Sequence, residues 1–255
     1  NGFSEAWGVS ADGAVVVGAT QSPSASNDEA FRWTQASGMV GLGFLAGGTD
    51  HSIAYAVSPS GSVIVGASGL QAFRWEDNVM VGLGFLGGGF VSEARDVSAD
   101  GSVVVGASNT SPSGETQAFR WENGVMIGLG GLPGEPIGSY AQGVSADGTI
   151  VVGSAATSAP GGAMAFIWDE SHGMRSVQDI LANDLGLNLN GWFLQEVMDV
   201  SADGRTLVGS ARNPQGLSEA WIAHIPEPGS LSLLLIGALT TLFRNRGARG
   251  SRAAI

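Results

Sequence analysis

Four aspartates stand at equivalent places in a repeated motif, and their type and spacing could support shared chemistry. Each belongs to a Ser-Ala-Asp-Gly sequence, and the members are Asp12-Gly13, Asp100-Gly101, Asp147-Gly148 and Asp203-Gly204, with Ser60 in the second copy. A ring of carboxylates would bind Ca²⁺ or a sugar. Asp-Gly is also the sequence of a tight hairpin turn, because glycine readily adopts positive φ and aspartate bonds to nearby backbone. We favour the turn, which makes these residues structural.

Other residues capable of chemistry are scattered. The three histidines, His51, His172 and His224, stand at unrelated positions, so nothing places converging ligands together. The stretch 82–87 matches GxGxxG, but this glycine pattern is a by-product of a repeat. The sequence therefore predicts no catalytic, cofactor-binding or metal-binding residues and no cofactor.

Two further residue types recur without forming a site. Three repeats carry an arginine at the same place: Arg32, Arg74 and Arg120. These arginines could pair with the turn aspartates, but some repeats have the arginine without the aspartate and others the aspartate without the arginine. The two tyrosines, Tyr55 and Tyr140, stand just before the hairpin valines, and we expect them in the core.

The elements that position these residues form a repeat of 40 to 56 residues. Each copy has a Val-Ser-x-x-Gly turn, a β-branched run that ends in glycine, and an Ala-Phe-Arg-Trp-like run; three copies close with a Gly-Leu-Gly run. Alternating β-branched segments separated by turns predict four short antiparallel strands per copy. The fold expected is all-β: a β-propeller-like array of about five units with the last incomplete, or alternatively a stacked β-solenoid. The units start near residues 3, 51, 91, 138 and 192, within a repeat domain of residues 1–225.

One aromatic segment per unit should supply the core. Alternation along a strand puts Phe31 and Trp33 on one face. We therefore expect the tryptophans of these segments to be buried at equivalent positions: Trp33, Trp75, Trp121, Trp168 and Trp221.

The fourth and fifth units depart from the pattern. After Trp168 the Gly-Leu-Gly strand is replaced by a segment in which apolar residues recur at helical spacing, which predicts a helix over 176–185 that stops at Gly186. The fifth unit runs into Pro226 without a fourth strand. Because propellers often borrow that strand from the N-terminus, we expect the chain to be the C-terminal part of a longer propeller.

The net charge of the repeat domain limits the classes of partner that it can bind. The chain has no lysine, and residues 1–225 carry seven arginines against 22 acidic side chains, a net charge of −15. Such a surface repels nucleic acid and anionic lipid. Cysteine is absent, which excludes disulfides, thiolate metal sites and a cysteine nucleophile.

The last thirty residues follow a different plan. Pro226-Glu227-Pro228 interrupts regular structure, an apolar helix-compatible run follows at 230–243, and the end is rich in arginine, beginning with Arg244 and Arg246. The run is short for a membrane span. The arginines would remain on the cytoplasmic side and leave the N-terminal part outside.

This order of elements at the C-terminus resembles the PEP-CTERM sorting signal of Gram-negative bacteria. The resemblance covers residues 226–255. It implies export, transient anchoring in the inner membrane, and removal of the tail by an exosortase, a membrane sorting enzyme. It also implies a cell-surface or extracellular location and an association with exopolysaccharide and biofilm.

The repeats resemble the HAF family of bacterial extracellular repeats over residues 1–225. The matching tripeptides are Glu29-Ala30-Phe31, Gln71-Ala72-Phe73, Gln117-Ala118-Phe119 and Met164-Ala165-Phe166. The histidine that names the family is missing in every copy. The resemblance implies architecture and location but no reaction.

These observations lead to two functional hypotheses. The first is an exported, non-catalytic surface or matrix protein that binds polysaccharide or envelope proteins or has a structural role. The alternative is a polysaccharide-acting hydrolase or lyase, since propellers host such enzymes. The long loops are rich in serine and hold no paired carboxylates, so we favour the first.

Overall fold

The computed structural model describes residues 3–21, 27–111, 114–159 and 161–226. The chain divides into two compact units, Asn1–Ile225 and Pro226–Ile255. Beyond Pro226 the second unit, with the sorting residues Glu227, Pro228, Arg244 and Arg246 and the apolar run 230–243, lies outside the described residues.

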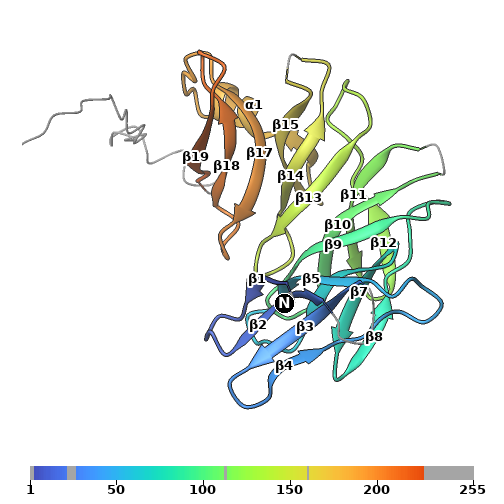
Figure 1. Cartoon of the computed structure of the whole chain (residues 1–255). Coiled ribbons are helices and arrows are strands. Elements are labelled where there is room, and N and C mark those ends of the chain that lie inside the picture. The colour runs from blue at the N-terminus through green and yellow to red at the C-terminus, as the bar shows by residue number, and fades with distance from the viewer. Residues whose placement is uncertain (1–2, 22–26, 112–113, 160, 227–255) are drawn as a thin grey trace, which may run out of the picture. The chain divides into compact units, whose positions relative to one another are not determined.

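Residues 3–225 form five separate antiparallel sheets, each built from consecutive strands (Figure 1). The first three sheets contain β1 (Ser4–Val9), β2 (Val15–Gln21), β3 (Asp28–Thr34) and β4 (Gly38–Gly41); β5 (Ser52–Val57), β6 (Ile64–Ser68), β7 (Gln71–Glu76) and β8 (Val79–Gly82); and β9 (Ser92–Val97), β10 (Val103–Asn109), β11 (Thr116–Glu122) and β12 (Val125–Gly128). The other two contain β13 (Ser139–Val144), β14 (Val151–Ala156), β15 (Ala163–Asp169) and β16 (Gly173–Ser176); and β17 (Phe193–Val200), β18 (Thr206–Arg212) and β19 (Ser218–His224).

The arrangement of the sheets is that of propeller blades. First strands contact the first strands of the neighbouring sheets, whereas fourth strands lie against the third strand of their own sheet. In each blade the first strand is therefore the innermost one, and successive blades lie side by side with their first strands in contact. Because no ladder joins one described sheet to the next, the alternative of a β-solenoid is wrong and the propeller-like array is confirmed.

The predicted hairpins join the first and second strands of each blade. The turn glycine has a φ of +72° to +75° in all five: Gly13, Gly61, Gly101, Gly148 and Gly204. A side chain would be strained there, which explains why glycine ends the motif in every copy.

The core lies between consecutive blades, and one aromatic ring per blade fills it. Phe73, Phe119 and Phe166 are fully buried, and each packs with residues of the preceding blade. The ring stands opposite a glycine of the second strand; Phe119, for instance, pairs with Gly106. In the fourth and fifth blades a Cβ on this glycine would lie 2.9 Å from the ring: Gly153 from Phe166 and Gly209 from Trp221.

The expected burial of the tryptophans is wrong for Trp33 and only partial for three others, which pack against the core clusters. Trp33 is 37% exposed, and Trp75, Trp121 and Trp168 are only half-buried. Trp221 is buried, but it pairs with Gly209 and so occupies the phenylalanine position of its blade. The fully buried ring is the one opposite glycine, and Trp33, Trp75, Trp121 and Trp168 stand two residues farther along the strand.

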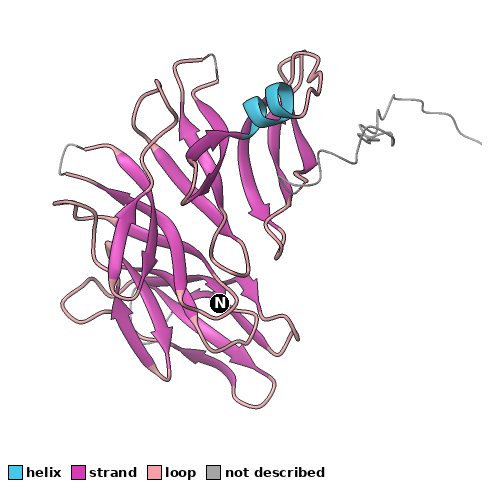
Figure 2. Ribbon diagram, turned by 180° about the vertical axis from the view of Figure 1, so that it is seen from behind, coloured by secondary structure: helices cyan, strands magenta, loops and turns pink. Residues whose placement is uncertain are grey.

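The fourth blade corrects a second expectation. Its Gly-Leu-Gly strand is not missing: β16 pairs with β15 in the register of the other blades, with Phe166 opposite Ser176. The predicted helix follows this strand as α1 (Val177–Asp179) and the π-helical turn η1 (Ile180–Asp184), shown in cyan in Figure 2. It buries Val177, Ile180 and Leu181 against the fourth and fifth blades, and Gly186 follows it with a φ of +68°.

The fifth sheet has three strands, in the order β17-β18-β19, as predicted. The outer edge of β19 carries no fourth strand among the described residues.

Candidate functional site

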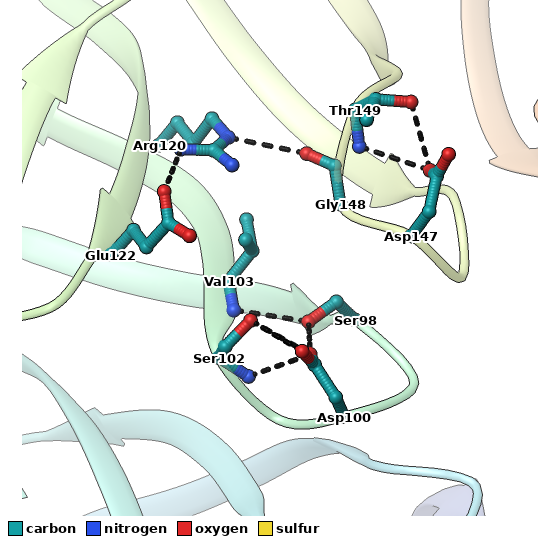
Figure 3. Close-up of polar contacts among 9 residues, drawn as sticks. All are labelled: Ser98, Asp100, Ser102, Val103, Arg120, Glu122, Asp147, Gly148 and Thr149. Carbon is teal, nitrogen blue, oxygen red and sulfur yellow. Dashed lines mark hydrogen bonds and ion pairs between the residues drawn. The ribbon is translucent and has the colours of Figure 1, made fainter.

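The turn aspartates form their hydrogen bonds within their own hairpins (Figure 3). The Asp100 Oδ1 atom accepts from the Ser98 hydroxyl at 2.7 Å and from the Ser102 amide at 2.9 Å, and the Ser98 Oγ atom accepts from the Val103 amide at 3.0 Å. These bonds stabilise the charged carboxylate, so they lower the pKa of Asp100 to about 2.

The other turn aspartates are arranged in the same way. The hydroxyl of the preceding serine and a backbone amide two residues farther on hold the pKa of Asp12, Asp147 and Asp203 below its ordinary value. The described residues contain no group of three or more acidic or histidine side chains placed to hold a metal. Each of these carboxylates therefore stabilises its own hairpin turn.

The recurring arginines bind the hairpin of the next blade rather than their own. The Arg74 Nε atom donates to the Gly101 carbonyl oxygen at 3.1 Å, and Arg120 donates to Gly148 at 3.2 Å (Figure 3). Each guanidinium also pairs with a glutamate of its own strand, Glu76 or Glu122, at 2.8 Å. Arg32 has the same register position in the first blade. Arg74 and Arg120 therefore contact the backbone of the next hairpin and a glutamate, not a turn aspartate.

The histidines do not converge. His172 bonds to Asp169 at 2.7 Å in the turn before β16, and the His224 ring lies 3.2 Å from the Thr206 hydroxyl at the end of β19. His51 precedes β5 in the second blade. The glycines at 82–87 lie at the end of β8 and in the following loop, not before a helix.

A feature that the sequence did not reveal lies on the innermost strands. Each first strand has a shift in register of the β-bulge kind at the same place, so the residue there has no partner on the second strand. Bulges redirect a side chain and are frequent beside functional sites. The bulged residues are Trp7, Tyr55, Arg95, Gln142 and Met198.

A repeated glycine makes the bulge possible. It is the glycine that ends each β-branched run and faces the bulge: Gly18, Gly66, Gly106, Gly153 and Gly209. A Cβ placed on Gly106 would collide with the Glu93 carbonyl oxygen, and the other four collide likewise with the first strand of their own blade. The glycine was visible in the sequence and is the signal that could have indicated the bulge.

The bulged residues of the first three blades contact one another. The Trp7 and Tyr55 rings meet edge to face with centroids 6.0 Å apart. The Arg95 guanidinium lies 4.5 Å from the centroid of the Tyr55 ring, a cation–π contact, and also pairs with Glu93 at 2.5 Å. Burial and the nearby Glu93 carboxylate raise the pKa of Tyr55 to about 12, although Arg95 acts in the opposite direction. Tyr55 is therefore a neutral phenol.

The same line of side chains leads to a cavity of about 170 Å³ between the third and fourth blades. Glu93 and Arg95 line it on one side, and Tyr140 and Gln142 on the other. Tyr140 is 50% exposed, so the expectation that it belongs to the core is wrong. We call the continuous surface of Trp7, Tyr55, Glu93, Arg95, Tyr140 and Gln142 the inner-strand face.

One half-buried acid, Asp96, follows Arg95 on β9. The Asp96 carboxylate accepts from the Val97 amide at 2.8 Å and from the Val144 amide of the next blade at 2.9 Å. Burial raises the pKa of Asp96 to about 7, and the Asp199 carboxylate adds to the rise. Asp96 thus joins the first strands of two blades.

The fold places the chain among the β-propellers. No protein-family model and no curated sequence matches it. It is similar in structure to TolB from Acinetobacter baumannii (TM-score 0.53, 18% identity, 87% of this chain and 51% of that one) and to a putative TolB from Agrobacterium tumefaciens (0.51, 16%, 86% and 73%). It is also similar to an oligogalacturonate lyase in complex with manganese (0.56, 11%, 86% and 61%). The chain therefore spans about half of the first TolB and less than two thirds of the lyase.

The described residues contain no helix long and apolar enough to cross a membrane. The predicted anchor at 230–243 lies outside them.

Proposed function

We propose that this chain is part of an exported bacterial protein that binds saccharide chains at the cell surface without cleaving them. The inner-strand face carries this proposal. Beside its cavity it combines the Tyr140 ring, which is 50% exposed, with a few polar groups, which is the composition of a small-molecule site.

The arrangement of its polar groups favours binding over catalysis. Glu93 is engaged by Arg95, and Tyr55 holds its proton to high pH, so neither is poised to exchange a proton near neutrality. Asp96 has a suitable pKa, but both its oxygens accept backbone amides within the blade junction.

Export is supported by the C-terminal pattern. Pro226-Glu227-Pro228, the apolar run and the arginines occur in the order of an exosortase signal. With this tail the protein would be anchored briefly in the inner membrane, processed, and delivered to the surface or the exopolysaccharide matrix. The acidic surface of residues 1–225 suits neutral or cationic partners rather than anionic ones.

A polysaccharide-acting lyase or hydrolase is the second candidate. The similarity to an oligogalacturonate lyase favours it, although at 11% identity that similarity concerns the fold.

Affinity electrophoresis through gels that contain neutral or acidic polysaccharides distinguishes the two candidates. We expect at least one polysaccharide to retard the protein while its chain length stays constant during long incubation. Shortened chains or new reducing ends would establish the enzyme instead. Unchanged mobility in every gel would remove the binding function.

A further inference from the structure

We infer that the cavity between the third and fourth blades binds the acetamido group of an N-acetylated amino sugar, with the sugar ring against Tyr140. This inference rests on the proposed binding function and specifies the class of saccharide. Three properties of the cavity carry it: an aromatic ring within the junction, a balanced pair of charges, and a carboxamide beside an apolar wall.

The exposure of Tyr140 is a feature of the blade junction itself. The third and fourth blades each contact a blade on both sides, so the 50% exposure of Tyr140 does not come from an end of the array. The Tyr140 side chain lines the cavity. Because the C–H face of a pyranose is apolar, it can pack on an aromatic ring, and Tyr140 supplies this contact for one sugar unit.

The charged groups of the cavity favour neither an anion nor a cation. The lining contains one acidic and one basic side chain, Glu93 and Arg95, and these two form an ion pair with each other. A uronate would have to displace Glu93 from the guanidinium, and a protonated amino sugar would have to displace Arg95 from the carboxylate. The cavity therefore selects its ligand through uncharged groups.

The polar side chains of the cavity differ in whether they are already engaged. The Ser108 hydroxyl and the Asn109 side-chain oxygen bond to the backbone of residues 86–91 at 2.8 to 3.0 Å, so they shape the wall. Within the described part of the chain, no hydrogen bond engages the side chains of Gln142 and Thr116, which also line the cavity. These two side chains are the ones available to a ligand.

Gln142 has the chemistry to bind an amide. It is the bulged residue of β13, and its carboxamide can donate to a carbonyl oxygen and accept from an N–H group at the same time. An acetamido group presents one N–H group and one carbonyl oxygen beside a methyl group. Val91, Ala107 and Ala141 form an apolar part of the lining against which the methyl group can pack.

The size of the cavity suits a substituent better than a whole sugar chain. Its volume of about 170 Å³ is smaller than the roughly 300–1,000 Å³ of sites for drug-sized ligands. It therefore has room for the acetamido group and part of one sugar ring, and the neighbouring sugar units would lie outside it.

Titration calorimetry of the full chain with three hexasaccharides tests this inference. The probes are chitohexaose, its fully deacetylated counterpart, and cellohexaose, which has hydroxyl groups in place of the acetamido groups. A slightly acidic buffer keeps the amines protonated, and about 0.5 M salt screens the acidic surface. We expect chitohexaose to bind at least about tenfold more tightly than either of the others, because only chitohexaose offers the amide and the methyl group.

Substitutions at the cavity separate selectivity from general binding. Gln142→Leu should weaken chitohexaose binding about tenfold and remove most of its advantage over cellohexaose, because that advantage depends on the carboxamide. Tyr140→Ala should weaken chitohexaose binding, whereas Tyr140→Phe keeps the ring and should retain most of the affinity. Gln215→Leu is the matched control, since Gln215 is an exposed glutamine in the turn before β19. It should bind like the wild type, and circular dichroism should show that all variants are folded.

Equal affinity for chitohexaose and cellohexaose, tighter binding of the deacetylated sugar, or unchanged selectivity in Gln142→Leu would overturn the inference and leave the binding function standing. Binding of an N-acetylated alanine peptide without binding of chitohexaose would assign the cavity to peptides and also overturn it. If none of the hexasaccharides binds, the inference is wrong, and the polysaccharide gels decide the binding function separately. Cleavage of chitohexaose would overturn the proposed function itself.

Discussion

Among single residues, the ring opposite glycine decides the stability of a blade junction. Phe119 is fully buried between the second and third blades, while Trp121, two residues along, is half-buried. The size of a side chain alone suggests the reverse ranking. Register explains the difference, because only the ring opposite Gly106 lies over a position without a side chain.

We therefore expect Phe119→Ala to lower the free energy of unfolding by about 3–5 kcal/mol, since it leaves a cavity in a packed junction. Trp121→Ala should cost clearly less. Urea unfolding followed by circular dichroism measures both. A larger loss in Trp121→Ala would show that the register is wrong.

The raised pKa of Asp96 predicts that its contribution to folding stability changes with pH in the direction opposite to that of the turn aspartates. Folded Asp96 keeps its proton up to about pH 7, whereas the unfolded chain releases it near 3.8. Between these values the folded state binds the extra proton, so stability falls as pH rises, by at most about 1.4 kcal/mol per pH unit. The turn aspartates have lowered pKa values, so the stability they contribute is lost only as the pH falls below about 4.

Asp96→Asn cannot titrate and should remove the decline in stability between about pH 4 and 7. The comparison is between the slopes of unfolding free energy against pH, because the substitution also removes an acceptor for one of the two backbone amides. An identical slope in the variant and the wild type would exclude Asp96 as the cause.

Among the elements, the hairpin does more than reverse the chain. A Cβ placed on Gly148 would lie 2.6 Å from the Cγ2 atom of Val103 in the preceding blade, and Gly61 and Gly101 have equivalent contacts. The Ala99 and Ala146 amides also donate to carbonyl oxygens in the hairpin of the following blade, at 2.9 and 3.1 Å. Each hairpin is therefore a contact between blades.

In Gly148→Ala the new Cβ would sit on a residue with positive φ and would also collide with Val103. In Gly124→Ala the residue has a positive φ of +82°, but its Cβ would meet no atom within 4 Å. We expect the substitution at Gly124 to cost about 1–2 kcal/mol and that at Gly148 about 1–3 kcal/mol more. Thermal or urea unfolding of the pair isolates the packing contribution. Equal losses would mean that the blades do not depend on this approach.

The sequence predicts the hairpins and the four-strand rhythm because turn chemistry is local: Asp-Gly and β-branched runs specify a hairpin wherever they occur. It misses β16 because Gly-Met-Arg-Ser lacks the Gly-Leu-Gly signature and owes its pairing to β15. It misses the inner-strand face because a bulge shows in register, not in composition. From its place in a strand the sequence predicts Tyr140 to be a core residue. Only the bulge and the neighbouring blade show that it lies on the surface.

At the scale of the whole molecule, the acidic blades and the arginine-rich tail have separate roles in the proposal. The blades supply the binding face, and the tail determines where that face is displayed. The proposal that the protein acts outside the cell depends on the tail, since the similar solved structures concern the fold alone.

The most direct test is the intact mass of the protein that its own bacterium displays or releases. We expect export followed by cleavage near Pro226-Glu227-Pro228, so the mature protein should lack the apolar run and the arginines. Replacement of these three residues by alanine should leave uncleaved protein in the membrane fraction, and deletion of 226–255 should release it after export. A mature protein that still extends to Ile255 would contradict exosortase sorting and remove the main support for a role at the cell surface.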